Sequence, residues 1–268
     1  MRHRLFPATA VLALALAPAA LAAGPDLGTT TTLNAGNVTY SAARAGSETS
    51  LAVRAADGHM LRQASLPGVW GIPRVTVNGD AAGLSHDGRM LVLARSTNPG
   101  RPLRSETRFL TVDTRRLAVT EAIRLRGDFG FDALSPNART LYLIEHHVAS
   151  DLSRYRVRAF DLKTGRLLPG AIVDKRDVAV PEPMSGFPAA RITTVDGRRV
   201  YTLYSSSEHP FVHALDTVSR TAVCIDLPAA IDQIELATMR LSHGGRRLTI
   251  LAPLGPRYVV DTKTFRVT

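Results

Sequence analysis

The chain has 268 residues, a formal net charge of +10 and a single cysteine, Cys224. One cysteine excludes an intramolecular disulfide, and a chain of this length can bury an adequate core without one. Of the 33 basic residues only Lys163, Lys175 and Lys263 are lysine, and the arginines are spread along the chain without a dense tract. We therefore do not expect a nucleic-acid partner, although a scattered basic surface can attract other polyanions.

The first 22 residues have the order of a secretory signal peptide. Arg2 and Arg4 give a basic start, residues 11–17 are an unbroken Val/Leu/Ala run, and small residues end at Ala22. The apolar run is shorter than the roughly 18 residues that a membrane span needs, and Pro18 interrupts it. We expect cleavage near Ala22 and a secreted, extracellular and monomeric product, 23–268, without a membrane anchor.

The rest of the sequence alternates short apolar runs with tight turns, which predicts β-strands. One motif is a Ser or Thr before a two-residue turn, a basic residue and an apolar strand. It occurs four times, beginning at Ser85, Ser135, Thr194 and Ser242. Turns such as Asp-Gly and Gly-Gly accept positive φ angles, so each copy predicts two adjacent antiparallel strands.

A second motif is an apolar strand that ends in Asp, followed by a short polar turn and another strand. Its Asp residues are Asp113, Asp161, Asp216 and Asp261, and a degenerate copy precedes Gly58. The carboxylate of each Asp can accept backbone N–H groups of its own turn. The recurrence of these residues is therefore a structural signal.

The two motifs together predict a unit of four strands that repeats roughly every 45 to 60 residues, as propeller blades do. Boundaries fall near residues 73, 128, 177 and 232. We expect an all-β chain with one domain, 23–268, that is a β-propeller of about five four-stranded blades; six incomplete blades are the alternative. Residues 29–33 are the candidate innermost strand of the first blade. We expect the N-terminal segment to close the ring by pairing with the last blade.

The alternation of these motifs resembles the YVTN-type and WD40-like β-propeller repeats of bacterial secreted proteins. The residues that carry this resemblance are Leu134-Ser135-Pro136-Asn137-Ala138-Arg139 and Phe160-Asp161-Leu162-Lys163-Thr164-Gly165. The segment 141–216 also resembles uncharacterised secreted actinobacterial propellers. The resemblance implies the fold and assigns no activity.

Propeller ligands bind over the central channel, on loops that a rigid scaffold positions. The long loops here are predicted at 95–107, 145–154 and 205–210, and they carry Glu145, His146, His147, Glu208 and His209. Imidazole and carboxylate groups are ligands for zinc and other first-row metals. No fixed ligand spacing is present, so the sequence leaves two readings open: solvated loop residues without a cofactor, or a divalent metal held by His146, His147 and His209.

Alignment of the repeats places Asp132 and Arg191 at the same height on the innermost strands of adjacent blades. We expect an ion pair between blades, because buried charges are normally paired; the alternative is an acid–base or anion-binding pair in the channel. Trp70 lies beside glycine in a connection between blades, as Phe129 and Phe187 do later. This recurrence favours packing between blades over an aromatic ligand platform.

The sequence thus predicts a binding or scaffold module, because no catalytic signature is recognisable and the loops of one face are long and varied. Its partner would be an extracellular protein, a glycan or a small molecule. The candidate ligand-binding residues are Trp70, Asp132, Glu145, Arg191 and His209. The alternative is a lactonase-like or metal-dependent hydrolase that uses Glu145, His146, His147 and His209.

Overall fold

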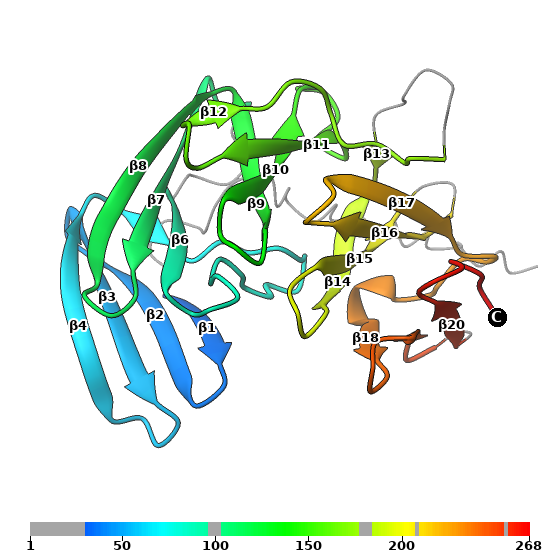
Figure 1. Cartoon of the computed structure of the whole chain (residues 1–268), viewed down its shortest axis with the longest axis horizontal. Helices are drawn as coiled ribbons and strands as arrows, with labels where there is room; N and C mark the ends of the chain where they lie inside the picture. Colours follow the sequence, from blue (N-terminus) through cyan, green and yellow to red (C-terminus); the bar gives the residue numbers. More distant parts are fainter. Residues whose placement is uncertain (1–29, 96–102, 177–183, 207–208, 255–256) are drawn as a thin grey trace, which may run out of the picture.

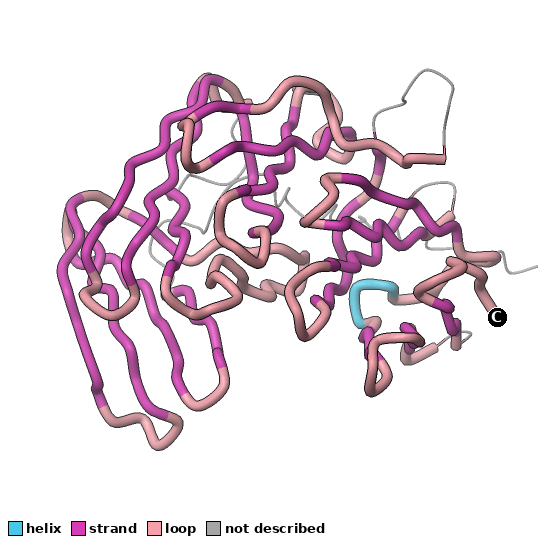
Figure 2. The backbone as a smooth tube through the Cα atoms, viewed as in Figure 1, coloured by secondary structure: helices cyan, strands magenta, loops and turns pink. Residues whose placement is uncertain are grey.

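The computed structural model describes residues 30–95, 103–176, 184–206, 209–254 and 257–268. Within these ranges the chain is almost entirely β, and its strands form five antiparallel sheets in chain order. Figure 1 shows the sheets following one another around the molecule, and Figure 2 shows how little of the backbone is helical. The expected β-propeller of about five blades is confirmed. Among the described residues, no helix is long and apolar enough to cross a membrane.

Each sheet is built from consecutive strands. Sheet 1 contains β1 (Thr31–Ala35), β2 (Val38–Ala45), β3 (Glu48–Ala55) and β4 (Met60–Pro67). Sheet 2 contains β5 (Trp70–Gly71), β6 (Met90–Arg95), β7 (Glu106–Asp113) and β8 (Ala118–Arg126). Sheet 3 contains β9 (Asp128–Leu134), β10 (Thr140–His146), β11 (Arg154–Asp161) and β12 (Arg166–Leu167), and β13 (Met184–Ser185) also pairs with β11.

The last two sheets follow the same order. Sheet 4 contains β14 (Phe187–Thr193), β15 (Arg199–Ser205), β16 (Phe211–Asp216) and β17 (Thr221–Asp226). Sheet 5 contains β18 (Thr238–Leu241), β19 (Arg247–Leu251) and β20 (Tyr258–Asp261), and the short 3₁₀ helix η1 (Ile234–Leu236) precedes it. The first strand of each sheet is the innermost.

Both repeated turns are closed by the side-chain hydrogen bonds that their sequences predict. The hydroxyl of Ser135 accepts the N–H of Thr140 at 2.9 Å, closing the first turn, and three equivalent bonds form in the other copies. In the second turn, Asp261 Oδ1 accepts the N–H groups of Lys263 and Thr264 at 3.0 and 2.7 Å. The threonine after three of the aspartates is buried and donates its hydroxyl hydrogen to the facing first turn, as Thr262 does to the Gly245 carbonyl at 2.7 Å. The two turns of a sheet are therefore tied together.

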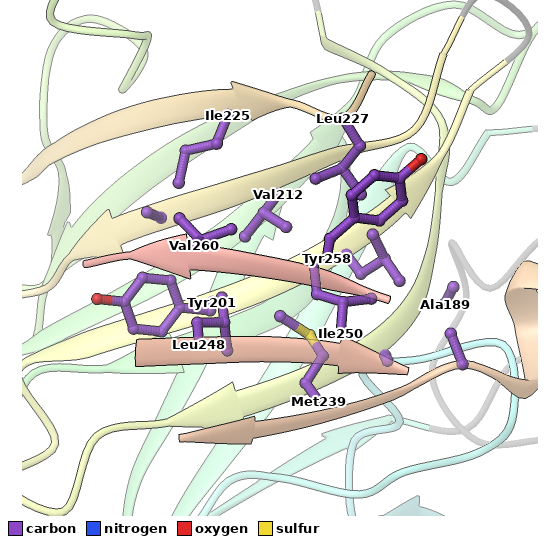
Figure 3. Close-up of a cluster of buried hydrophobic side chains, with 14 of the residues drawn as sticks. Ala189, Tyr201, Val212, Ile225, Leu227, Met239, Leu248, Ile250, Tyr258 and Val260 are labelled. Atoms are coloured by element: carbon purple, nitrogen blue, oxygen red, sulfur yellow. The ribbon is translucent and has the colours of Figure 1, made fainter. Parts of the chain in front are cut away.

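Alternation of side chains along the strands buries an apolar face between neighbouring sheets. Four clusters fill the four successive interfaces from sheet 1 to sheet 5. Figure 3 shows the cluster between sheets 4 and 5, where Tyr201 and Val212 meet Leu248, Ile250 and Val260. Within the described ranges, no comparable cluster joins sheet 5 to sheet 1.

The strand β1 confirms the expected innermost strand of the first blade, and the expected closure of the ring by the N-terminal segment stays a prediction, because the residues before 30 lie outside the described ranges. β1 pairs with β2 of its own sheet. The outer edge of sheet 5 is taken by the C-terminal residues, because Val259 and Thr268 exchange backbone hydrogen bonds of 2.8 and 2.9 Å. The C-terminal residues therefore supply the fourth position of sheet 5. Residues 1–29, including the expected signal peptide, lie outside the described ranges.

The innermost strand of sheet 2 is interrupted by a hairpin-like excursion, residues 73–82, which we call the inner hairpin. Its two arms are joined by hydrogen bonds from Val75 N–H to Asp80 O and from Ala82 N–H to Pro73 O, of 2.8 and 3.0 Å. Its tip reaches β14, where the N–H of Val77 donates to Pro188 O at 2.8 Å. The side-chain amide of Asn78 also donates to Glu235 O in η1. The inner hairpin therefore links sheet 2 to sheets 4 and 5 across the centre (Figure 1).

The turn that enters sheet 4 gives the first prediction. Gly186 has a φ of +146°, and a methyl group there would collide with the carbonyl oxygen of Ser205. Gly165 also has a positive φ, +65°, but open space surrounds it. We expect Gly165→Ala to cost about 1 kcal/mol of unfolding free energy and Gly186→Ala at least about 3 kcal/mol, since only the second adds a backbone collision. Urea unfolding of both variants measures the difference. Equal losses of unfolding free energy would contradict the close approach of Gly186 to the Ser205 carbonyl oxygen.

Candidate ligand-binding site

A cavity of about 50 Å³ lies where sheets 2, 3 and 4 meet the inner hairpin. It is lined by the beginnings of β9, β11 and β14 and by the ends of β10 and β15. This is the face formed by the connections between sheets and by the loops between second and third strands. It is therefore the face on which the sequence places the ligand site.

A buried ion pair forms one wall of the cavity. Arg191 on β14 donates from Nη1 to Asp132 Oδ1 at 2.8 Å and from Nη2 to the Asp132 carbonyl oxygen at 2.7 Å. The two side chains are only 8% and 4% exposed. The expected ion pair between adjacent blades is thus confirmed, and it joins the innermost strands of sheets 3 and 4. Because both charges are desolvated, each depends on the other for compensation.

Aromatic rings form most of the remaining wall. They come from all three sheets and are Phe109, Phe129, Phe131, Tyr155, Phe187 and Tyr204. The rings of Tyr155 and Tyr204 stack with centroids 5.3 Å apart. The Tyr155 hydroxyl is buried and has no hydrogen-bond partner among the described residues. Burial raises the pKa of both phenols above their ordinary value, so both are neutral at physiological pH.

His146 at the end of β10 also lines the cavity. Its Nδ1 lies 3.1 Å from the carbonyl oxygen of Leu152. A carbonyl only accepts, so the neutral ring carries its hydrogen on Nδ1 and leaves Nε2 as an acceptor. Burial is the main cause that lowers the pKa of His146 below its usual value, which keeps the ring neutral.

A second buried histidine, His213 on β16, lies behind this wall between sheets 3 and 4. Its ring makes an edge contact with Tyr204, at a centroid distance of 6.4 Å. Its Nε2 has no hydrogen-bond partner among the described residues. Burial lowers the pKa of His213 to about 4, partly offset by the negative charge of Asp132.

The structure separates the histidines and carboxylates that the sequence grouped as a metal site. Glu145 is bound by Arg158 Nη1 at 2.7 Å, and His209 Nε2 lies 3.2 Å from Asp226 Oδ1. His147 is half-buried and its Nδ1 has no partner in the described chain, whereas His146 faces the cavity. Glu208 lies outside the described ranges. Among the residues that are described, no three His, Cys, Asp or Glu side chains gather in a way that could hold a metal ion.

Trp70 does not line the cavity and packs against the cluster between sheets 1 and 2. Its indole Nε1 donates to the Pro67 carbonyl at 2.6 Å, and its N–H donates to the buried Thr49 hydroxyl at 2.7 Å. Phe129 occupies the same place in the next sheet, bonded to Thr107. These contacts agree with the interpretation that Trp70 packs between blades.

Of the predicted site residues, the cavity brings together Asp132, Arg191 and His146. Sequence reasoning missed Tyr155, Tyr204 and the inner hairpin. The tyrosines sit in alternating strand patterns that are typical of core residues, so their position alone did not mark them. The Asn78-Gly79 turn inside an expected innermost strand was the signal that could have revealed the inner hairpin.

Comparison with known proteins supports the fold. No protein-family model matches the sequence, and no curated protein does either. A functionally unknown protein from Desulfotomaculum acetoxidans shares 13% identity, with 89% of this chain and 68% of that chain covered and a TM-score of 0.54. The β-propeller domain of Cps50 (Swd1) from Myceliophteria thermophila shares 13% identity over 90% and 68% of the two chains, with a TM-score of 0.51.

A candidate 6-phosphogluconolactonase from Bacteroides uniformis shares 15% identity over 88% and 68% of the two chains, but its TM-score of 0.49 is too low to carry an argument. Identities at this level show the fold alone. The chain has the β-propeller fold.

The buried His213 gives the second prediction. An unfolded histidine titrates near 6.5 and the folded His213 near 4, so the unfolded state binds the proton first as the pH falls. The contribution of the buried neutral ring to the unfolding free energy is fully present above about pH 7. It is lost as the pH falls from about 6.5 to 4. We expect His213 to account for about 2 kcal/mol of the unfolding free energy lost between pH 7.5 and 5, and His213→Gln to lack this share. The loss that comes from His146, whose pKa burial also lowers, should remain in the variant.

Urea unfolding at both pH values measures this loss. The control is His209→Gln, which removes an imidazole that is 46% exposed and should keep the wild-type pH dependence. If His213→Gln lost as much unfolding free energy between the two pH values as the wild type does, the burial of a neutral His213 would be contradicted.

Proposed function

We propose that this chain is a binding module that holds its ligand in the cavity between sheets 2, 3 and 4. The observation that supports this proposal is the composition of the cavity wall: aromatic rings from three sheets surround the buried Asp132–Arg191 pair. Ligand pockets are typically apolar clefts with a few placed polar groups, and this wall has that character. The loops of the same face would contact the rest of an extracellular protein, a glycan or a small molecule.

The cavity is small, so a larger ligand would place one group in it and lie over the loop face with the remainder. Such a buried anchor at the centre of a contact surface supplies much of the affinity in protein complexes. No specific observation favours the hydrolase alternative. Glu145 and His209 are each engaged in an ion pair on the surface of a different sheet.

The third prediction tests the cavity as the ligand site. A thermal-shift panel of divalent metals with a chelator, sugars, lactones and polyanions is run on the wild type and on two tryptophan variants. Ile144→Trp fills the cavity, which Ile144 lines. Val195→Trp changes a turn residue that is 97% exposed on the opposite face. A ligand at about 100 times its dissociation constant adds roughly 2.7 kcal/mol of stability, a shift of several degrees.

We expect an active compound to raise the melting temperature of the wild type and of Val195→Trp, and to leave that of Ile144→Trp unchanged. The folded state of Ile144→Trp is checked by circular dichroism before the panel is read. A panel in which every active compound shifts both variants equally would contradict the cavity as the site.

We also propose that the protein is secreted after removal of residues 1–22, on the basic, apolar and small-residue order of that segment. The fourth prediction follows from it. N-terminal sequencing of the product from the culture medium of an expressing bacterium should begin at Ala23. Cell-bound protein that retains Met1 would contradict secretion.

A further inference from the structure

We propose that the face of the molecule opposite the cavity binds an anionic polysaccharide, with a segment of the polymer lying in a groove between sheets 4 and 5. This second site is independent of the cavity and goes beyond the binding function proposed for it. Three features support it: the charge that the repeat gathers on this face, the shape and lining of the groove, and the kinds of side chain that the turns expose.

The cavity lies where the first strands of the sheets begin, and the two repeated turns of sheets 2 to 5 lie at the other ends of the strands. We call these turns and the residues that adjoin them the turn face. The turn face consists of residues 85–89, 113–117, 135–139, 161–166, 194–199, 216–220, 242–247 and 261–266.

The turn face carries most of the net charge of the chain. It contains thirteen arginines and lysines and six aspartates, a formal net charge of +7, whereas the whole chain has +10. The corresponding turns of sheet 1, residues 35–38 and 55–60, contain no arginine or lysine. Arginines that are scattered along the sequence are therefore gathered by the repeat on one side of the molecule.

One arginine occupies the same position in each of the four sheets. Its carbonyl oxygen accepts the N–H of the residue that follows the aspartate of the second turn, at 2.8 to 3.1 Å. The four residues are Arg89, Arg139, Arg198 and Arg246, and all four side chains are exposed. Sheets that pack face to face lie about 10 Å apart. The four arginines therefore form a row across the turn face, with neighbours on the order of 10 Å from one another.

The aspartates of the turn face are directed into their own turns. Each of the six accepts at least one backbone N–H of its turn through a side-chain oxygen. Asp216 is buried, and Asp113, Asp161 and Asp261 are half-buried, whereas twelve of the thirteen basic side chains are exposed. An anion that approaches this face therefore meets guanidinium and ammonium groups first. Arginine pairs with carboxylate and phosphate groups through two parallel hydrogen bonds.

A groove of about 950 Å³ lies on the turn face between the first turns of sheets 4 and 5. Ligand sites in proteins have volumes of roughly 300 to 1,000 Å³, so the groove has room for a segment of a polymer. Its lining includes three basic side chains, Arg199, Arg246 and Lys263, and one carboxylate, that of Asp196. The groove therefore favours an occupant with negative charge.

Arg199 is held in place between the two sheets. Its Nη1 donates to the Thr262 carbonyl oxygen at 3.0 Å, and the guanidinium carbon lies 5.6 Å from the centroid of the Phe265 ring. A side chain that is already ordered loses less conformational entropy when a ligand binds. The cation of Arg199 is thus fixed in the groove before a ligand arrives.

The exposed side chains favour a polysaccharide over other anionic partners. Every Phe, Tyr and Trp side chain in the described ranges is buried or half-buried, and the large apolar side chains exposed on the turn face are Val195 and Val218. Protein interfaces are enriched in aromatic residues, amphipathic membrane anchors use Trp, Phe and Leu, and single-stranded nucleic acids stack on aromatic rings. A polysaccharide with carboxylate groups is polar along its whole length and needs none of these.

The fifth prediction compares carboxymethyl-dextran with uncharged dextran of the same length by isothermal titration calorimetry. We expect carboxymethyl-dextran to bind and dextran not to bind. The logarithm of the association constant should fall linearly with the logarithm of the salt concentration, because the bound polymer and protein release counterions. Oligothymidylate, polyglutamate and phosphatidylglycerol vesicles should each bind about tenfold more weakly at the same salt concentration, since the stacking and apolar contacts that they use are missing.

A quadruple variant tests the row of arginines. It combines Arg89→Gln, Arg139→Gln, Arg198→Gln and Arg246→Gln. The backbone hydrogen bonds of the four residues are kept, so the variant should fold, which urea unfolding checks. Carboxymethyl-dextran should bind it about a hundredfold more weakly than the wild type, and the salt dependence should become shallower.

The matched control removes the same net charge from the cavity face. It combines Arg44→Gln, Arg126→Gln, Arg154→Gln and Arg257→Gln, which change exposed side chains near the opposite ends of the strands. A strand of seven residues spans about 23 Å, more than the Debye length of about 10 Å, so these charges are screened from the turn face. The control variant should bind carboxymethyl-dextran within about threefold of the wild type.

A second pair of variants tests the groove. Arg246→Gln with Lys263→Gln removes two basic groups from its lining, and Arg115→Gln with Arg116→Gln removes two from the second turn of sheet 2 on the same face. We expect the first double variant to bind carboxymethyl-dextran about tenfold more weakly and the second to lose less affinity.

The outcomes that overturn the proposal are distinct. If carboxymethyl-dextran does not bind, or if the two quadruple variants lose equal affinity, the turn face is not the site. If oligothymidylate, polyglutamate or the vesicles bind more tightly, the ligand is not a polysaccharide, and equal losses in the two double variants would exclude the groove. Ile144→Trp should bind carboxymethyl-dextran as the wild type does, so polyanions are the one class in the thermal-shift panel that should stabilise it. Failure of this site and failure of the cavity are thereby told apart.

Discussion

The ion pair between Arg191 and Asp132 is the interaction on which the candidate site depends. It joins the innermost strands of two sheets, and both side chains are almost completely buried. A buried charge without its partner costs several kcal/mol, so the pair holds β9 and β14 at one relative height. Through this constraint the aromatic rings beside each strand meet as one wall. The pair itself is electrically balanced, and it gives the cavity polarity without giving it a net charge.

The repeated turns and the inner hairpin supply the rest of the scaffold. Each Asp-Thr turn is closed by its own carboxylate and tied by the threonine hydroxyl to the neighbouring turn, so the sheets are rigid at the face opposite the cavity. The inner hairpin adds a connection that no repeat contains. Its tip donates hydrogen bonds to β14 and η1, and its base lines the cavity, so it couples sheet 2 to the last two sheets. The connections on the cavity face are then free to differ between sheets.

The repeat made much of this predictable from sequence. Because each unit has the same two turns, aligned positions share a height, and the sequence alone therefore predicts Asp132 beside Arg191. The innermost strand of sheet 1 and the aspartate-capped turns followed from the same alignment. What the repeat does not encode could not be predicted in this way. The inner hairpin breaks the pattern, the C-terminal edge of sheet 5 depends on three residues, and the stack of Tyr155 on Tyr204 depends on how sheets 3 and 4 pack together. His146 was a candidate metal ligand in one of the two readings that the sequence left open, because its residue type was visible and the direction of its Nδ1 hydrogen bond to Leu152 was not.

The account depends most on whether a ligand enters the cavity at all, and crystals soaked with a library of small polar fragments measure this most directly. We expect fragments to appear between the rings of Phe129, Tyr155 and Tyr204, in contact with Asp132 and His146, while the Asp132–Arg191 pair keeps its geometry. Fragments that bind only at other faces of the propeller, with the cavity wall unchanged, would contradict the account.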